Sequence, residues 1–202
     1  MKAHLRLIGD VHGHVDRYRK LCRKALYTIQ LGDHAFDYCH LNGLDPNYHK
    51  ILGGNHDNYD KIEAWPHYLG DYGSYYVPDF GEIFFVRGGL SIDKHLRTER
   101  ISWWPDEEMS MRKCYAAMSS YASAKPSFVI SHTCPADAIP FVTNSGHMIP
   151  SRTSQLLNQM FAIHQPLMWI FAHFHTSLRF HINETEFVCL NELECLDFEK
   201  RS

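Results

Sequence analysis

Five short apolar segments, each leading into polar residues, limit the folds open to this sequence of 202 residues. Each has three to five residues, which is too short for a buried helix and typical of a buried strand. Several are followed by glycine, which permits the sharp turns that end such strands. The five segments are residues 5–9, 28–31, 50–52, 128–130 and 167–171.

Helical patterns lie between several of these segments. Apolar residues at helical spacing predict a helix over residues 15–26. Pro105 and the three acids after it are typical of a helix start, because proline suits the first turn and acids suit the positive end of the helix dipole. Ser151 is a good N-cap for a later helix. The predicted helices cover residues 15–26, 58–65, 105–121 and 152–163.

The alternation of strands and helices, followed by a strand-rich end, predicts an α/β fold. Further strands are expected at residues 75–77, 83–86, 178–182 and 186–190. The last three strands, at residues 167–171, 178–182 and 186–190, are close enough in sequence to pair antiparallel. We expect a mixed β-sandwich flanked by helices. No linker or internal repeat interrupts the chain, so we expect one domain over residues 1–202.

Composition argues against several classes of protein. With 45% hydrophobic and 13% aromatic residues, the chain is not of the disordered type. The longest apolar run, residues 167–172, is far shorter than the roughly 20 residues of a membrane span. We see no secretory signal, and we expect a cytoplasmic protein with six reduced cysteines and no membrane association. The net charge of −3 disfavours a broad nucleic-acid surface, whereas 15 histidines favour metal binding or acid–base chemistry.

Carboxylate, amide and imidazole groups stand directly after the five apolar segments. In open α/β sheets, ligands bind beyond the carboxyl ends of the strands, so these groups are expected to converge at one edge. The groups are Asp10 with His12, Asp33, Asn55 with His56 and Asp57, His132, and His173 with His175.

The spacing of these groups predicts shared ligation. Residues two apart in an extended chain point the same way, so Asp10 and His12 are expected to face one ion, and His173 and His175 likewise. Such ligands suit borderline or hard divalent metals without any thiolate. One shared carboxylate would hold two ions about 3.5–4 Å apart, an arrangement that clamps both oxygens of a phosphoryl transfer.

The same residues, in this order, resemble the motifs of the calcineurin-like metallophosphoesterase superfamily. The match runs from residue 9 to residue 175, through Gly9-Asp10-x-His12-Gly13, Gly32-Asp33, Gly54-Asn55-His56-Asp57, His132 and His173-x-His175. Each motif alone is weak, but five in the correct order are specific. The resemblance implies a four-layer α-β-β-α fold and two divalent ions, which the ligand types leave open among manganese, iron, zinc and nickel.

The resemblance also implies a role for each residue. Asp10, His12, Asp33 and His175 would bind the first metal, and Asp33, Asn55, His132 and His173 the second, with Asp33 bridging. A metal-bridging hydroxide would attack phosphorus in line. His56 would protonate the leaving oxygen, and Asp57 would orient or polarise His56. Metal ions lower the pKa of bound water and histidine titrates near neutral pH, which is why these residue types suit these roles.

The sequence departs from the family pattern in three places. Ala172 stands where the last motif usually begins with glycine, and we expect it to be tolerated provided its φ is negative. Tyr38 follows Asp37, where the protein serine/threonine phosphatase branch has an arginine that binds the phosphate. The third motif ends in Asp57, where that branch favours glutamate. These differences weigh against protein phosphatase activity.

Other polar residues are weaker candidates. Lys94, His95, Arg97 and Arg100 form a local basic stretch, and an arginine fork suits phosphate oxygens, so Arg97 and Arg100 are candidate substrate contacts. His34 and Asp37 are candidate neighbours of the ligands. The long segment after His132 is typical of binding loops, which makes His147 a further candidate. Each could equally be a solvated surface residue.

The resulting hypothesis is metal-dependent hydrolysis of a small phosphodiester, nucleotide or phosphomonoester. The alternatives are a non-catalytic metal-binding scaffold on the same fold, a histidine-rich metal-storage module, and a protein serine/threonine phosphatase. A degenerate scaffold should lack the acid or several ligands, whereas all are present here. Storage would require well over two ions per chain. Neither the substrate nor the oligomeric state follows from the sequence.

Overall fold

Two β-sheets pack face to face in the computed structural model, which describes residues 3–143 and 151–200. His147 lies outside these residues. The first sheet has four strands in the order β10 (Cys195–Phe198), β1 (Ala3–Ile8), β2 (Ala25–Gln30) and β3 (His49–Ile51). The second has six, in the order β4 (Tyr72–Val77), β5 (Gly81–Val86), β6 (Phe128–Ser131), β7 (Met168–Phe171), β9 (Thr185–Cys189) and β8 (Leu178–Ile182).

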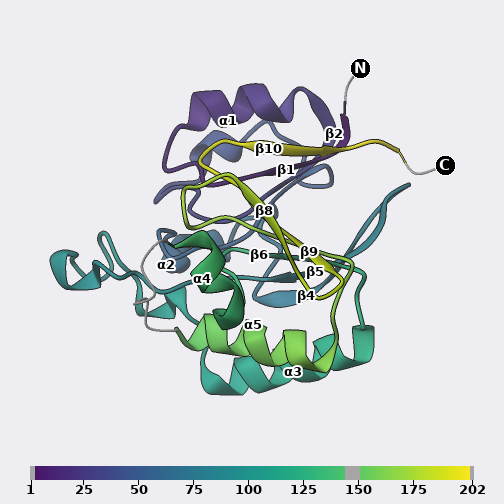
Figure 1. Ribbon diagram of the computed structural model, residues 1–202. Coiled ribbons are helices and arrows are strands. Elements are labelled where there is room, and N and C mark those ends of the chain that lie inside the picture. The colour runs from purple at the N-terminus through teal and green to yellow at the C-terminus, as the bar shows by residue number, and fades with distance from the viewer. Residues whose placement is uncertain (1–2, 144–150, 201–202) are drawn as a thin grey trace.

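Helices cover the outer faces of both sheets. Figure 1 shows α1 (Val15–Cys22) on the outside of the four-stranded sheet, and α3 (Met111–Ala124) and α5 (Arg152–Ile163) beneath the six-stranded sheet. Two one-turn helices, α2 (Tyr59–Ile62) and α4 (Ile139–Val142), lie in the connections. This arrangement confirms the predicted mixed sandwich of sheets flanked by helices.

Alternating side chains of the strands fill the three layers between these elements. In β5, Ile83 and Phe85 point into the core between the sheets, while Phe84 and Val86 point toward the helices. Strands buried on both faces carry apolar residues at successive positions, which is why the sequence shows unbroken apolar runs here. Trp169 and Tyr121 are buried within the helical layer.

The parallel strands bring their carboxyl ends to one edge of the sandwich. β1, β2 and β3 pair in parallel, as do β5, β6 and β7. The loops that follow these six strands therefore leave the sheets in the same direction, as ligand sites in α/β folds require. The last hairpin, β8 with β9, is antiparallel as predicted, whereas β7 pairs with β9 in parallel, so the antiparallel prediction is wrong for β7.

Several predicted boundaries differ from the structure. The helix predicted over residues 15–26 ends at Cys22, because Ala25 begins β2 and pairs with Ala3 of β1. The helix predicted over residues 58–65 is the single turn α2. The helix predicted from Pro105 is a single 3-10 turn, and α3 begins six residues later, where the Ser110 hydroxyl accepts from the Lys113 N–H. Strand β10, which has only four residues, was not predicted. In contrast, Ser151 caps α5 as expected.

Candidate metal centre

Two groups of ligand atoms meet at the carboxyl edge of the sheets and share Asp33. We call the first the rim group, and it comprises Asp10, His12, Asp33 and His175. The inner group comprises Asp33, His132 and His173, with Asn55 beside them. Within each set of histidines and aspartates, one ligand atom from every member lies within 4.8 Å of the others. The structure therefore brings together all seven residues predicted as ligands.

The rim group presents nitrogen and oxygen atoms to a common point. The Nε2 atoms of His12 and His175 are 3.0 Å apart, and His175 Nε2 is 3.3 Å from Asp10 Oδ2. His12 Nε2 is 3.7 Å from Asp33 Oδ2. Two imidazoles with two carboxylates are a ligand set suited to a borderline divalent cation, so the residues fit the group that the motifs imply.

The inner group is held by partners outside the ligand set. His132 Nδ1 lies 2.8 Å from the Leu31 carbonyl oxygen, which only accepts, so Nδ1 carries the proton. Its Nε2 faces the Asn55 and Asp33 oxygens at 2.9 and 3.3 Å. The Asn55 amide donates to Ser91 Oγ at 3.1 Å, which turns the Asn55 oxygen toward the site. A cation there would meet ligands already oriented.

Left-handed backbone at the ligands replaces the extended chain that the spacing suggested. His12, Asp33, His173 and His175 all have positive φ, between 45° and 70°. His173 and His175 follow the end of β7 in this turn, so they belong to different groups, and the prediction that both face one ion is wrong. Asp10 and His12 do share a group. Such backbone costs about 1–3 kcal/mol per residue and concentrates at functional sites.

Two glycines allow the loops to approach closely. A Cβ at Gly54 would collide with the Asp33 side chain and N–H, and one at Gly32, where φ is +99°, would collide with the His132 ring. At the corresponding place in the last motif, Ala172 is buried and its φ is not positive, so its methyl group is tolerated as expected.

Asp57 connects two ligand loops through hydrogen bonds. Within the described residues, its hydrogen-bond partners do not include the His56 ring. One carboxylate oxygen accepts from the N–H groups of Asp33 and Gly54 at 2.8 and 2.7 Å. The other accepts from the His34 N–H and the Tyr38 hydroxyl. The structure thus differs from the prediction that Asp57 orients His56 directly, because its lone pairs are used to fix the loops of Asp33 and Asn55.

Tyr38 occupies the position where the protein phosphatase branch has its arginine. The ring is buried, and the hydroxyl donates to Asp57 at 2.9 Å and accepts from the Asn58 N–H. This position therefore supports the loop carrying Asp33 and offers no cation to a phosphate.

Arg97 is the arginine that reaches the site, and it does so from another loop. Its Nη2 is 3.3 Å from His56 Nε2. Asp93 accepts from Arg97 Nε and Nη2 at 2.8 and 2.7 Å, which fixes the guanidinium in a bidentate pair. Asp93 and Ser91 were not predicted from the sequence as site residues. The spacing of four residues between Asp93 and Arg97 was the available signal for the ion pair.

The other weak candidates lie elsewhere. Arg100 is exposed and pairs with Asp60, away from the residues that line the pocket. The His34 ring packs on Tyr18 and His40, so only its N–H contributes, through Asp57. Asp37 is exposed and accepts from the Cys39 N–H.

Burial and like charges set the electrostatics of the site. Burial raises the pKa of Asp10 well above its ordinary value, and repulsion from Asp33 adds to this. Burial acts the same way on Asp33, but positive charge on His132 and His56 outweighs it, so the pKa of Asp33 is lowered. Divalent cations would relieve the repulsion between the two carboxylates.

His56 projects from the far side of Asp33, whose Oδ1 accepts from the His56 N–H at 2.7 Å. The pKa of the His56 ring is lowered. Burial is the largest cause, the negative charge of Asp33 opposes it, and the positive charge of Arg97 adds to it. His56 is thus a titratable group beside, but outside, both ligand groups.

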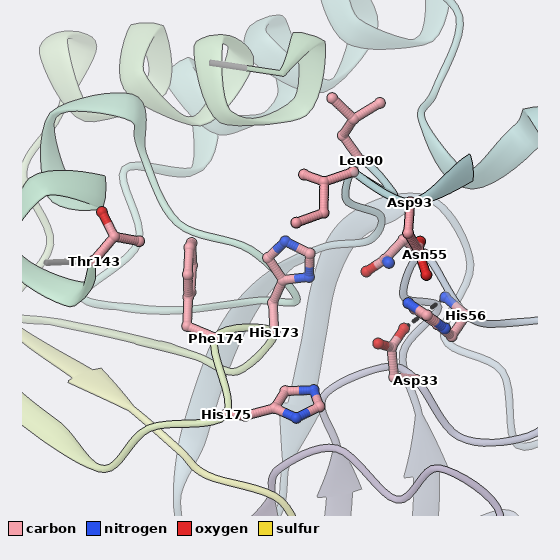
Figure 2. A pocket seen from close by; sticks show the side chains of 10 residues that line it. Asp33, Asn55, His56, Leu90, Asp93, Thr143, His173, Phe174 and His175 are labelled. Atoms are coloured by element: carbon pink, nitrogen blue, oxygen red, sulfur yellow. Dashed lines mark hydrogen bonds between the residues drawn. The ribbon is translucent and has the colours of Figure 1, made fainter. Parts of the chain in front are cut away.

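A pocket of about 400 Å³ opens over the inner group, and Figure 2 shows its walls. Asp33, Asn55 and His56 gather on one side of His173, and Phe174 and Thr143 lie on the other. This volume is in the range of small-molecule sites.

Comparisons with known proteins agree with this fold. A family model described as calcineurin-like phosphoesterase matches residues 4–177. The chain belongs to that family, which is typically dependent on two metal ions and which supports phosphoester hydrolysis as the general activity. No curated protein matches this sequence.

Solved structures resemble the chain at low sequence identity. The structure described as GAP50, the anchor in the inner membrane complex of Plasmodium, superposes with a TM-score of 0.51 at 10% identity, covering 94% of this chain and 72% of its own. Phosphopantetheinyl hydrolase from Mycobacterium tuberculosis has a TM-score of 0.47 at 10% identity, with 95% and 91% coverage. At this identity the first likeness shows the shared fold alone. In the described residues, no helix has the length and apolar character of a membrane span.

Proposed function

We propose that this protein hydrolyses a small phosphodiester, nucleotide or phosphomonoester, with one divalent ion held by the rim group and one by the inner group. The observation that carries the proposal is the sharing of Asp33 between two complete ligand sets, with a separate histidine alongside. Divalent ions in such a pair supply a hydroxide nucleophile at neutral pH and withdraw charge from phosphoryl oxygens.

His56 is proposed as the general acid. Its place outside both ligand groups leaves the ring free to give a proton to the leaving oxygen. Before substrate binds, the lowered pKa favours the neutral ring at pH 7. A bound phosphoryl group brings negative charge, which favours the protonated ring that an acid must have.

Arg97 is proposed as the phosphate-binding residue. Asp93 holds its guanidinium with Nη2 beside His56, where a charge-assisted hydrogen bond to a phosphoryl oxygen is possible. Arg97→Gln should raise KM about tenfold or more, because a hydrogen bond to a charged group contributes about 1.5–3 kcal/mol. Arg100→Gln is the matched control on the same loop, and equal effects of the two variants in steady-state kinetics would contradict this role.

The size of the pocket and the position of Tyr38 favour a small substrate over a folded phosphoprotein. The pocket of about 400 Å³ accepts a compact ligand, and the site lacks the arginine that the protein phosphatase branch uses at residue 38. A small phosphoester, unlike a folded phosphoprotein, can bind within such a pocket without an extended docking surface.

A metal-titrated assay tests the proposal. The metal-free protein is supplied in turn with manganese, iron, zinc or nickel and tested on bis(4-nitrophenyl) phosphate and 4-nitrophenyl phosphate. We expect turnover to rise with up to two ions per chain and to be abolished by chelation. Full activity after complete metal removal would contradict the proposal. Two bound ions without turnover would favour the non-catalytic scaffold, and many more than two would favour metal storage.

A further inference from the structure

The pocket over the inner group is lined by two chemically different sets of side chains. We call Asp33, Asn55 and His56 the anion-binding wall, because the proposed function assigns them to the phosphoryl group. We call Leu90, Ile92 and Phe174 the apolar wall. The remaining lining residues are Asp93, Thr143, His173 and His175. Figure 2 shows His173 between Phe174 and the group of Asp33, Asn55 and His56.

The apolar wall is built by the same loops that carry the ligands. Leu90 and Ile92 follow β5 and flank Ser91, whose hydroxyl orients Asn55. Phe174 stands between the ligands His173 and His175, and its ring packs edge-on against Phe171, with centroids 5.9 Å apart. These side chains are therefore fixed relative to the metal centre by the residues that form it.

Part of the apolar wall is exposed to solvent. A cavity of about 10 Å³ shares Leu90, Ile92 and His173 with the pocket, and its other lining residues are Ile139, Thr133, Ser151 and Ser154. Ile92 itself is 74% exposed. Removing an exposed apolar side chain from water is favourable, so a ligand that covers Ile92 with an apolar group would gain binding free energy.

We propose that the substrate is an amphipathic phosphoester, whose alkyl or aryl group lies against Leu90, Ile92 and Phe174 while its phosphoryl group lies against Asp33 and His56. This inference rests on the proposed function and narrows it, because it favours an apolar substituent over a sugar or other strongly polar one. The juxtaposition of an anion-binding wall and an apolar wall in one pocket of about 400 Å³ carries it.

Binding of alkylphosphonates to the metal-loaded protein tests the inference without relying on turnover. Their carbon–phosphorus bond is not an ester, so calorimetry from methyl- to hexylphosphonate measures affinity alone. We expect affinity to rise about fourfold for each of the first few methylenes, which corresponds to about 0.8 kcal/mol per buried CH2. We also expect an increasingly negative heat-capacity change, which marks burial of apolar surface. Affinity independent of chain length would overturn the inference.

A pair of exposed isoleucines on one loop supplies a matched comparison. Ile92 lines the pocket, whereas Ile101 is 69% exposed and is not among the residues lining it. Ile92→Ser should lower the ratio of hexyl- to methylphosphonate affinity about fivefold or more, and Ile101→Ser should leave that ratio unchanged. Equal effects of the two variants would overturn the inference.

The assay on nitrophenyl phosphates separates this inference from the proposed function. Metal-dependent hydrolysis together with a flat chain-length series would remove only the amphipathic substrate. Absence of both hydrolysis and phosphonate binding would remove the proposed function and this inference together.

Discussion

The rim group and the inner group use similar residues but are supported differently. The His132 side chain is fully buried, and Leu31 and Ser91, which are not ligands, orient the inner residues. The His175 side chain is 48% exposed, and its Nε2 contacts are with His12 and Asp10, which are members of its own group. We infer that the inner site is formed before an ion binds, whereas the rim site depends more on the ion.

This difference implies that the inner ion is held more tightly and exchanges more slowly. Ligands that are already oriented lose less conformational entropy on binding, and outer partners that fix a histidine or an amide strengthen the site. Four predictions test this difference between the two groups.

Asp33→Ala should have the largest effect, because Asp33 belongs to both groups. Loss of both ions should reduce turnover by more than the roughly 10²–10³-fold that removal of one electrostatic stabiliser costs. Metal content per chain and kcat measure this. Asp37→Ala is the control, since that carboxylate is exposed and outside both groups. A variant that keeps two ions would contradict the sharing of Asp33.

His56→Ala should separate proton transfer from metal binding, because His56 lies outside both groups. We expect a loss of about 10²–10⁴-fold in kcat with two ions retained, which is the usual contribution of a general acid. His95→Ala is the control, since His95 is an exposed histidine of the basic stretch over residues 94–100 and its loss should have little effect. Loss of an ion from the His56→Ala protein would show that His56 is a ligand instead.

Ser91→Ala should weaken the inner site alone. Within the described residues, Ser91 forms hydrogen bonds with Asn55 and Glu107 and with no member of the rim group. Removal of such an outer partner typically costs about 10–100-fold in metal affinity. Competition with a chelator resolves the two binding steps. Equal weakening of both steps would argue against independent support of the inner group.

Acidification should release the rim ion before the inner ion. Metal binding requires unprotonated imidazole. Loss of hydration lowers the pKa of His173 to about 3, with charge on His132 as a second cause. Burial also lowers the pKa of His12, and Asp33 raises the pKa of both rings, but the His12 side chain is 23% exposed, so burial acts on it less strongly. Protons therefore compete for His12 at a higher pH than for His173. Metal per chain after dialysis at falling pH should show two steps, and simultaneous release would contradict the comparison.

The positions of the ligands could be predicted from the sequence because they depend on local pattern. Apolar runs buried on both faces become parallel strands, and the residues after Ile8, Gln30 and Phe171 must leave at the same edge. The side-chain directions could not be predicted from spacing. His173 and His175 diverge because each has left-handed backbone, which only the surrounding loops hold in place.

Asp57 and Arg97 show the same limit. Asp57 lies next to His56 in sequence, yet its carboxylate accepts from the N–H groups of Asp33 and His34 on the loop after β2. Arg97 is 41 residues away and contacts the His56 ring. Sequence adjacency fixes only the backbone connection, whereas the partner of a buried polar group depends on which donors the fold brings near.

The family, the sandwich of sheets, the identity of the seven candidate ligands and their division into two sets could be inferred from the sequence, because they follow from residue type, order, the periodicity of burial and the resemblance of the motifs. The left-handed backbone of the ligands, the arginine beside His56 and the apolar wall of the pocket became apparent only in the tertiary structure. Those features depend on contacts between loops distant in sequence, and such contacts leave no periodic pattern in the chain.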